Sequence, residues 1–292
     1  MPYDDNNNAK LFFYTKLRMK ISIITATFNS GRTVADTLES VLAQDYSDYE
    51  LIVKDGGSRD NTLDICRSYE ARFEGRLRII SEPDRGIYDA MNQGIAAATG
   101  DVVGILNSDD FYTSNDILST VAAEFAAHSS LDAVYGDVHY VDEADTSRLV
   151  RYYSSRRFSR WQMRLGFMPA HPSFYCRRTV YERYKLDGTA IAGFKGNPTC
   201  AYFNTTYRIA ADFENLLRLI FVNRIATRYV ARDFVTMRTG GASSSGLQSH
   251  RVIIGEHLRA YRENGVHSNV LLEAMRYPFK LAELVVARIG GR

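Results

Sequence analysis

Two adjacent aspartates, Asp109 and Asp110, stand on a short turn directly after an apolar run. Two carboxylates in this position suit a hard divalent cation such as Mg²⁺ or Mn²⁺, which often takes one or two protein carboxylates and completes its coordination with phosphate and water oxygens. The alternative is an acidic turn that caps the helix expected at Ile117. However, Asp55 and Asp84 end two other apolar runs, and carboxylates gathered together repel each other unless a cation or hydrogen-bond donors are supplied. The pattern therefore indicates a metal-assisted site.

The elements that must position these aspartates are short apolar runs that alternate with helical periods. Strands are predicted at 21–25, 50–54, 77–81, 102–106 and 133–140. Helices are predicted at 34–42, 62–73, 87–98, 117–127, 211–221, 248–263 and 270–289, the last bent at Pro278. This alternation predicts an α/β fold with a mostly parallel central sheet covered by helices. Ligands bind beyond the carboxyl ends of such strands, so four strand ends should form one polar, acidic rim.

Composition and motif searches argue against several classes of protein. The 292 residues include 36 Lys or Arg and 34 Asp or Glu, so the net charge of +2 does not indicate a nucleic-acid binder. Three Cys without a C-x-x-C pair argue against a disulfide framework or a zinc site, and they favour the reducing cytoplasm. No apolar run is long enough for a membrane span. The turns after the strands lack the glycine patterns of dinucleotide-binding and Walker-type enzymes.

Short motifs follow one another between Met19 and Glu263. They are IITATFN at 23–29, VKDGGSRDNT at 53–62, EPDRGIYDAMNQG at 82–94, NSDD at 107–110, HPS at 171–173 and YRIAADFE at 207–214. This succession resembles family 2 glycosyltransferases with the GT-A fold, in the branch that builds bacterial capsular and colanic-acid-like polysaccharides. NSDD fits the metal-binding DXD motif of that family.

On the donor side, the resemblance implies that the nucleotide contacts residues of the first three strand ends, namely Thr27, Phe28, Asn29, Asp55, Gly56 and Asp84. Phe28 would pack on the base, with Thr27 beside it. Asp55 would accept a hydrogen bond from the base, and Asp84 would lie near the nucleotide.

Nearer the reaction centre, the resemblance implies that Asp109 faces the ribose or sugar and that Asp110 holds the metal on the donor diphosphate. Asp212 falls where the family places its catalytic base. Taken alone it is better explained as a helix N-terminal charge favoured by the macrodipole, but within the motif the catalytic interpretation is preferred. His171 would reach the diphosphate or metal, and residues 240–243 would close over it. A packed histidine and a plain linker are the alternatives for these last two.

The expected activity is inverting, metal-dependent transfer of a sugar from a nucleoside-diphosphate sugar to a lipid-linked saccharide in surface polysaccharide biosynthesis. A cation stabilises the charge on the leaving diphosphate, and a carboxylate takes the proton of the acceptor hydroxyl. A nucleotidyltransferase that makes a nucleotide sugar is an alternative, but it would need a more basic loop after the first strand. A non-catalytic carbohydrate- or nucleotide-binding module is another, against which Asp110 and Asp212 together argue.

The chain is expected to divide into three parts. Residues 1–18 are polar and aperiodic and are expected to be a disordered extension outside the fold. Residues 19–247 form the glycosyltransferase domain, with a nucleotide-binding half at 19–112 and an acceptor half at 113–247, and residues 248–292 form a C-terminal helical segment. Residues 185–202 look longer than the usual link in the family. They are expected to be a surface loop that shapes acceptor choice, with neutral drift as the alternative.

Two segments suggest contact with a membrane. Residues 146–181 contain eight Arg and no acid, interleaved with Tyr152, Tyr153, Phe158 and Trp161. The closing helix adds basic residues that include Arg276 beside apolar ones that include Met275. Because basic residues near an anionic leaflet contribute ~1 kcal/mol each, peripheral attachment to the inner face of the plasma membrane is expected. The alternative is a solvated basic surface with its aromatic residues in the core.

Overall fold

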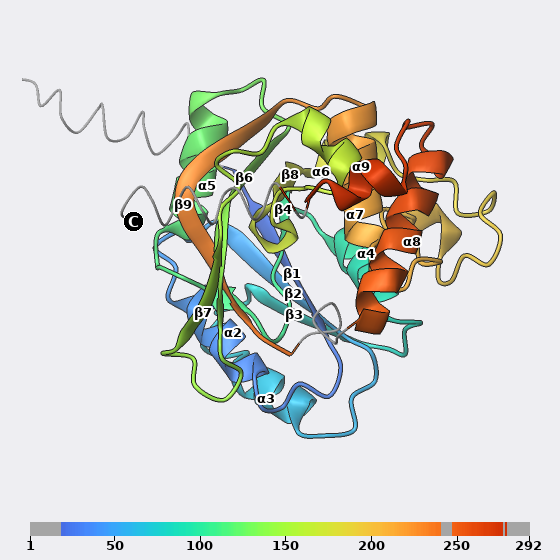
Figure 1. Ribbon diagram of the computed structural model, residues 1–292. Coiled ribbons are helices and arrows are strands. Elements are labelled where there is room, and N and C mark those ends of the chain that lie inside the picture. Colours follow the sequence, from blue (N-terminus) through green and yellow to red (C-terminus); the bar gives the residue numbers. More distant parts are fainter. Residues whose placement is uncertain (1–18, 241–246, 277, 279–292) are drawn as a thin grey trace, which may run out of the picture.

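The computed structural model describes residues 19–240, 247–276 and 278, and the strands in that part form one continuous sheet (Figure 1). The sheet order is β3-β2-β1-β4-β8-β6-β9-β5, with β7 paired to β6. The first strands are β1 (Ile21–Thr27), β2 (Tyr49–Asp55), β3 (Leu77–Ser81), β4 (Val102–Ile105) and β5 (Phe111–Tyr112). They are followed by β6 (Ala133–Val141), β7 (Leu149–Tyr153), β8 (Tyr175–Arg177) and β9 (Thr227–Arg238).

Helices connect and cover these strands. The α-helices are α2 (Val34–Leu42), α3 (Thr62–Ser68), α4 (Ile87–Ala97), α5 (Ile117–Ala127), α6 (Arg178–Arg183), α7 (Ala211–Leu216), α8 (Leu247–Glu263) and α9 (Val270–Ala274). Short 3₁₀ segments are η1 (Arg160–Leu165), η2 (His171–Ser173) and η3 (Pro198–Cys200), and a π-helical segment, η4 (Leu217–Val222), continues α7.

Strand β1 separates two apolar cores because successive side chains of a strand point to opposite faces. Ile21 and Ile23 pack with residues of α2, α3 and α5, whereas Ile24 packs with residues of α4, α7 and α8. All three isoleucines are fully buried. The sheet is therefore covered by helices on both faces, as predicted (Figure 1).

The parallel part of the sheet consists of β3, β2, β1 and β4. Their carboxyl ends lie at the same edge, which confirms the predicted rim. Beyond β4 the sheet is mixed, since β8 runs antiparallel to β4 and β6, and β5 antiparallel to β9, while β6 and β9 are parallel. The expectation of a mostly parallel sheet thus describes the first half better than the second.

Several elements differ from the sequence-based expectation. Strands β5, β7, β8 and β9 were not predicted. In β9, charged residues such as Arg232 and Asp233 interrupt the apolar alternation, and its pairing partner β6 lies far away in the sequence. Helix α3 ends at Ser68 instead of residue 73. The helix expected at 211–221 changes from α- to π-helical geometry at Leu217.

The C-terminal segment also differs from expectation. Helix α8 contributes Ala260 and Tyr261 to the core that contains α4 and α7, so it is an integral part of the domain. Helix α9 covers only Val270–Ala274, and most of the helix expected at 270–289 lies outside the described residues. The expected extension at 1–18 and most of the 239–246 loop lie outside them as well.

Glu50 ties the start of the parallel strands to the loop before β4. Its carboxylate accepts hydrogen bonds from Ser22 Oγ (2.5 Å), Thr99 N (2.7 Å), Gly100 N (3.2 Å) and Lys20 Nζ (3.0 Å). Burial alone would raise the pKa of the Glu50 carboxyl, but the hydrogen bonds from Ser22, Thr99 and Lys20 outweigh burial and lower it to about 2.

We expect Glu50→Gln to lower the free energy of unfolding by about 3 kcal/mol at pH 7, since each pKa unit corresponds to ~1.4 kcal/mol. The lowered pKa makes this stabilisation complete above the unfolded-state value of 4.5 and progressively lost as the pH falls towards 2. Urea unfolding of both proteins between pH 7 and pH 2.5 measures the difference. Glu70→Gln, on an exposed position, is the control and should be neutral. A constant difference across that range would contradict the assignment.

Candidate active site

The turn that carries Asp109 and Asp110 is held by side chains from the start of α2. Thr33 Oγ1 donates to the Ser108 carbonyl (2.8 Å), and Thr37 Oγ1 donates to the Asp110 carbonyl (2.7 Å). The Ser108 hydroxyl also lies 2.8 Å from that of Ser30. Because these bonds satisfy the backbone of the turn, the two carboxylates are fixed at the carboxyl end of β4 without being consumed in holding the turn.

The two carboxylates are unequal. Asp110 is 2% exposed, and burial followed by the neighbouring Asp109 charge raises its pKa well above the usual range. Burial also raises the pKa of Asp109. The cation beside them is Arg238, at the end of β9, which donates to the Asp109 carbonyl (2.6 Å) and to the Asp36 carboxylate. Arg238 offsets only part of the penalty, so this pair favours a bound cation.

No group of three or more His, Cys, Asp and Glu suitable for a metal occurs among residues 19–240 and 247–276. Two protein carboxylates are nevertheless enough for Mg²⁺ or Mn²⁺, which usually keep water and substrate phosphate oxygens as further ligands. Asp109 and Asp110 therefore fit an ion of this kind. Water and substrate oxygens would supply the remaining ligands of the ion.

Asp55, Gly56 and Asp84 come together at the ends of β2 and β3. Asp55 is fully buried, and its carboxylate accepts hydrogen bonds from Gly57 N (3.0 Å), Ser58 N (3.1 Å) and Ser81 Oγ (2.8 Å). A Cβ at residue 56 would lie 2.5 Å from Asp84 Oδ2, so only glycine allows this approach. Asp55 organises the loop, and its expected bond to the base stays a prediction.

A buried lysine compensates the charge at these two strand ends. Lys54 is fully buried, and its Nζ donates to the carbonyls of Asp55 (2.7 Å) and Glu82 (2.6 Å) and lies 3.7 Å from Asp84 Oδ2. The ends of β2 and β3 are thus neutralised and cross-linked by one side chain.

Thr27, Phe28 and Asn29 continue β1 into the rim. Phe28 is 61% exposed, so its ring is available to a flat ligand. Asn29 has a positive φ of 51°, and its side chain accepts from Arg59 N (2.8 Å), which joins the β1 and β2 turns. Thr27 is 4% exposed, and its Oγ1 has no hydrogen-bond partner among the described residues. The three residues lie where a nucleotide was expected.

Asp212, at the start of α7, and Asp110 both act electrostatically on Tyr140. The charges of both Asp110 and Asp212 raise the pKa of Tyr140 on β6, after burial as the main cause and against the opposing effect of Arg151. Burial lowers the pKa of His171, and the Asp212 charge partly offsets this. Tyr140 therefore lies within electrostatic reach of both Asp110, the expected metal ligand, and Asp212, the expected catalytic base, and His171 lies within reach of Asp212.

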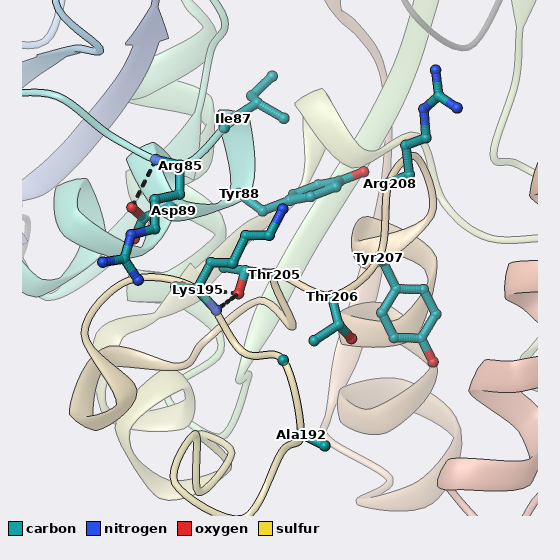
Figure 2. A pocket seen from close by; sticks show the side chains of 12 residues that line it. Arg85, Ile87, Tyr88, Asp89, Ala192, Lys195, Thr205, Thr206, Tyr207 and Arg208 are labelled. Carbon is teal, nitrogen blue, oxygen red and sulfur yellow. Dashed lines mark hydrogen bonds between the residues drawn. The ribbon is translucent and has the colours of Figure 1, made fainter.

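A pocket of about 440 Å³ lies between the start of α4 and the 192–208 segment (Figure 2). Tyr88 lines it and is also affected by Asp212, because burial and then the Asp212 charge raise the pKa of Tyr88. Ala192, Gly193 and Lys195 contribute to its wall. The 185–202 segment, which was expected to shape acceptor choice, thus forms part of this pocket.

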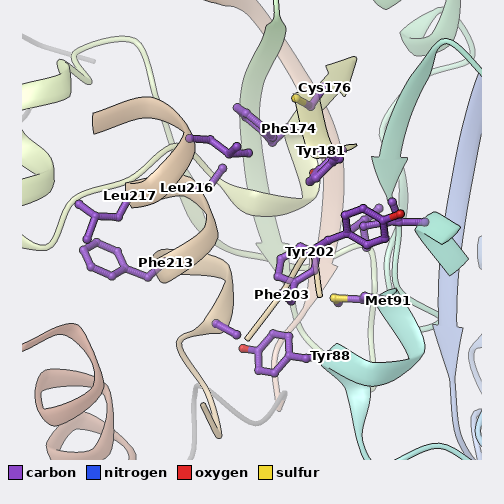
Figure 3. Packing of buried hydrophobic residues seen from close by; sticks show 14 of the residues in the cluster. Tyr88, Met91, Phe174, Cys176, Tyr181, Tyr202, Phe203, Phe213, Leu216 and Leu217 are labelled. Atoms are coloured by element: carbon purple, nitrogen blue, oxygen red, sulfur yellow. The ribbon is translucent and has the colours of Figure 1, made fainter. Parts of the chain in front are cut away.

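The loop that leads into Asp212 rests on an aromatic core (Figure 3). Tyr88 stacks on Phe203 with ring centroids 6.0 Å apart, and its hydroxyl donates to the Ile209 carbonyl. On the other side of Asp212, Phe213 is fully buried and stacks on His257 of α8 at 3.7 Å. Packing on both sides thus restricts where the Asp212 backbone can lie.

Glu256 on α8 completes this support. Its carboxylate accepts hydrogen bonds from the backbone N–H groups of Arg208 (2.6 Å), Ile209 (2.9 Å) and Ala210 (2.8 Å). These groups precede α7 and would otherwise need other partners. Helix α8 of the C-terminal segment therefore positions the loop that precedes Asp212.

Sequence reasoning missed Tyr140, Arg238 and Glu256. The local signal near Arg238 is the Thr239-Gly240 turn that directly follows it in the sequence. Tyr140 and Glu256 carry no local signal, because their importance comes from residues thirty or more positions away in the sequence.

Solved structures with this fold are GT-A glycosyltransferases. One is TarS residues 1–349 of S. aureus in complex with UDP-GlcNAc (TM-score 0.59, 20% identity, 82% of this chain and 66% of that chain). Another is the mannosyltransferase PcManGT of Pyrobaculum calidifontis in complex with GDP-Man and Mn²⁺ (TM-score 0.59, 17% identity, 98% and 84%). This chain spans only 43% of a longer TarS structure. At these identities the likeness establishes the fold.

The chain belongs to glycosyl transferase family 2, whose family model matches residues 22–185. A PGL/p-HBAD biosynthesis glycosyltransferase of Mycobacterium bovis BCG is 32% identical over 210 residues, which are 72% of this chain and 73% of that protein. A glycosyltransferase of Mycobacterium tuberculosis is 29% identical over 278 residues (93% and 90%). The chain is therefore a glycosyltransferase enzyme, which disfavours the nucleotidyltransferase and the non-catalytic module. The capsular branch stays a prediction.

We expect Glu256→Gln to lower turnover at least ~10-fold while nucleotide binding stays unchanged, because the Asp212 loop loses a carboxylate that holds three N–H groups. Charge-assisted bonds of this kind contribute ~1.5–3 kcal/mol, so stability should fall as well. Glu263→Gln is the matched control. Glu263 lies on the same helix as Glu256 and accepts a hydrogen bond from Tyr207 OH (2.7 Å), but it does not hold the loop backbone. It should lower stability but not turnover. Wild-type turnover in Glu256→Gln would contradict this positioning role.

Proposed function

We propose that this chain is an inverting, metal-dependent glycosyltransferase that transfers a sugar from a nucleoside-diphosphate sugar to a lipid-linked saccharide, in assembly of a bacterial surface polysaccharide of the capsular or colanic-acid type. The observation that carries the proposal is the turn that holds Asp109 and the buried Asp110 at the carboxyl end of β4, in a chain that belongs to glycosyl transferase family 2. The donor diphosphate would bind at Asp110, and the acceptor hydroxyl would approach Asp212. The nucleotide sugars bound by TarS and PcManGT support this donor class.

Asp109 and Asp110 would hold the divalent cation. Their burial and adjacency make a bound cation favourable, and the Mn²⁺ complex of PcManGT supports the same expectation. When bound, the cation supplies Lewis-acid stabilisation of the charge that develops on the leaving diphosphate.

The residues of the chain then divide the remaining work. Phe28 offers an exposed ring to the base, beside the loop that Asp55 organises. Asp212 accepts the proton of the acceptor hydroxyl as it attacks the anomeric carbon. His171 is 9% exposed and has a lowered pKa, so it is neutral at pH 7 and can donate a hydrogen bond without adding charge near Asp212. A single displacement from the face opposite the leaving group inverts the anomeric centre.

The membrane contact is part of the proposal, and the structure changes which residues it involves. The two segments expected to contact the membrane are neighbours, since Arg164 Nε of η1 donates to the His267 carbonyl (2.7 Å) just before α9. Trp161 is 54% exposed and Leu271 of α9 is 79% exposed. Arg156, Arg157 and Arg160 are exposed in the same region as Trp161. We propose that these five residues, together with the exposed Val270 and Met275, form the membrane face of the protein.

Other residues that the sequence assigned to this contact are used within the fold. Arg276 is buried and donates to Glu273 Oε1 (3.0 Å), so its assignment to the membrane face is wrong. Arg177 and Arg178 donate to the carbonyls of Leu131 (2.6 Å) and Gly100 (2.9 Å). None of the helices in the described ranges is long and apolar enough to cross a bilayer.

Asp110→Asn should abolish metal-stimulated release of nucleoside diphosphate from the sugar nucleotide while the metal-free protein remains at least as stable as wild type. The reason is that the substitution removes a buried charge next to Asp109, which is costly when no cation is bound. Turnover with and without Mn²⁺, and urea unfolding in EDTA, measure the two effects. Asp64→Asn, exposed on α3, is the control and should change neither. Undiminished metal stimulation in Asp110→Asn would exclude the assignment.

Asp212→Asn should slow transfer by ~100- to 10,000-fold, the usual effect of losing a general base. Because the side chain faces the acceptor, the affinity for nucleoside diphosphate measured by calorimetry should stay within about twofold of wild type. A large loss of nucleotide affinity would instead make Asp212 a donor-binding residue.

The triple substitution Arg156→Gln, Arg157→Gln and Arg160→Gln should weaken binding to anionic vesicles by roughly 100-fold, since each basic residue contributes ~1 kcal/mol. Flotation at low and high salt measures it, because screening should weaken the contact in the same way. Arg67→Gln, exposed on α3, should not matter. Equal wild-type binding to neutral and anionic vesicles would rule out the electrostatic contact.

A further inference from the structure

The pocket between α4 and the 192–208 segment has a net positive lining. Its residues include three basic side chains, Arg85, Lys195 and Arg208, all exposed, and one acid, Asp89. No ion pair joins the three basic residues to any carboxylate in the part of the chain that the structure describes. Figure 2 shows the Lys195 side chain extending along Tyr88, between Arg85 and Arg208.

Asp89, the acidic residue of the pocket, already accepts hydrogen bonds from other residues of the chain. Asp89 is 3% exposed, and its Oδ2 accepts hydrogen bonds from Arg85 N (3.1 Å) and Gln93 Nε2 (3.2 Å). Its other oxygen is covered by the backbone at Gly196, where a Cβ would lie only 1.9 Å from Oδ1. Gly196 also has a φ of +93°, which favours glycine. The charge left to face a ligand is therefore positive.

The wall that carries Lys195 is built into the fold. The Thr205 hydroxyl accepts a hydrogen bond from Lys195 N (2.7 Å) and donates to the Lys195 carbonyl (2.9 Å). On the neighbouring wall, Thr206 Oγ1 accepts from Arg259 of α8 (2.5 Å). Lys195 therefore projects from a backbone that is fixed on both sides.

We infer that this pocket binds a phosphate group carried by the acceptor substrate, an inference that rests on the proposed function. Three cations without partners suit a dianion better than a neutral sugar, and guanidinium and ammonium groups are the usual phosphate donors. The location agrees with the acceptor side, because the pocket shares Tyr88 with the surroundings of Asp212. The Asp109–Asp110 pair, where the donor diphosphate is proposed to bind, belongs to a different strand end.

The test uses the full chain, saturated with nucleoside diphosphate and Mg²⁺ so that the donor site is filled, and methyl phosphate as the probe. ³¹P NMR follows the two ligands separately. We expect the loaded wild-type protein to bind methyl phosphate, and Arg85→Gln combined with Lys195→Gln to weaken that binding at least tenfold. Lys185→Gln is the matched control. Lys185 is the first residue of the 185–202 segment, and it pairs with Glu182 (3.0 Å) outside the pocket.

The outcomes separate this inference from the proposed function. If nucleoside diphosphate fails to bind, the proposed function fails. If it binds but methyl phosphate does not, or if the double variant binds methyl phosphate as well as wild type does, the pocket inference alone is overturned. Competition by glucose 6-phosphate or by dihexanoyl phosphatidic acid then shows whether the phosphate is presented by the sugar or by the lipid part of the acceptor, and either result supports the site.

Discussion

The crowding of carboxylates at one edge of the sheet is the constraint on which the rest of this structure depends. Parallel pairing of β1 with β2 and β4, and of β2 with β3, brings Asp55, Asp84 and the Asp109–Asp110 pair to the same edge. Each charge there needs compensation, because burial in a medium less polar than water raises its free energy. The backbone of the Gly57-Ser58 turn satisfies Asp55, and Lys54 compensates Asp84. Asp110 keeps a penalty that Arg238 only partly relieves.

This uneven compensation separates structural from functional acids. Asp55 is fully buried, accepts several hydrogen bonds and organises a loop, whereas Asp110 is buried with a raised pKa and is the carboxylate that we propose holds a cation. An apoprotein that holds such a site is less stable than it could be. The buried isoleucines of β1, which face a core on each side of the sheet, supply the stability that this arrangement requires.

The second half of the chain serves mainly to place Asp212. Strand β6 carries Tyr140 towards both aspartates, and β9 brings Arg238 back to the Asp110 turn. Helix α8 holds the loop before Asp212 through Glu256. The 185–202 segment then adds a wall beside Tyr88, in the pocket that we propose binds the acceptor.

The sequence by itself determined the local features: the first four strands, most helices, the family and the identity of the conspicuous aspartates. These follow from hydrophobic periodicity and from short motifs, which depend only on neighbouring residues. The tertiary structure decided everything that depends on distant pairing. Strand β9 contains Arg232 and Asp233 and is stabilised as a strand by β6, so its own residues do not predict it. Burial likewise distinguished Arg276 from the exposed arginines. Only packing could place Glu256 against the loop before Asp212, because a carboxylate in a helix is indistinguishable from its surface neighbours until its partners are known.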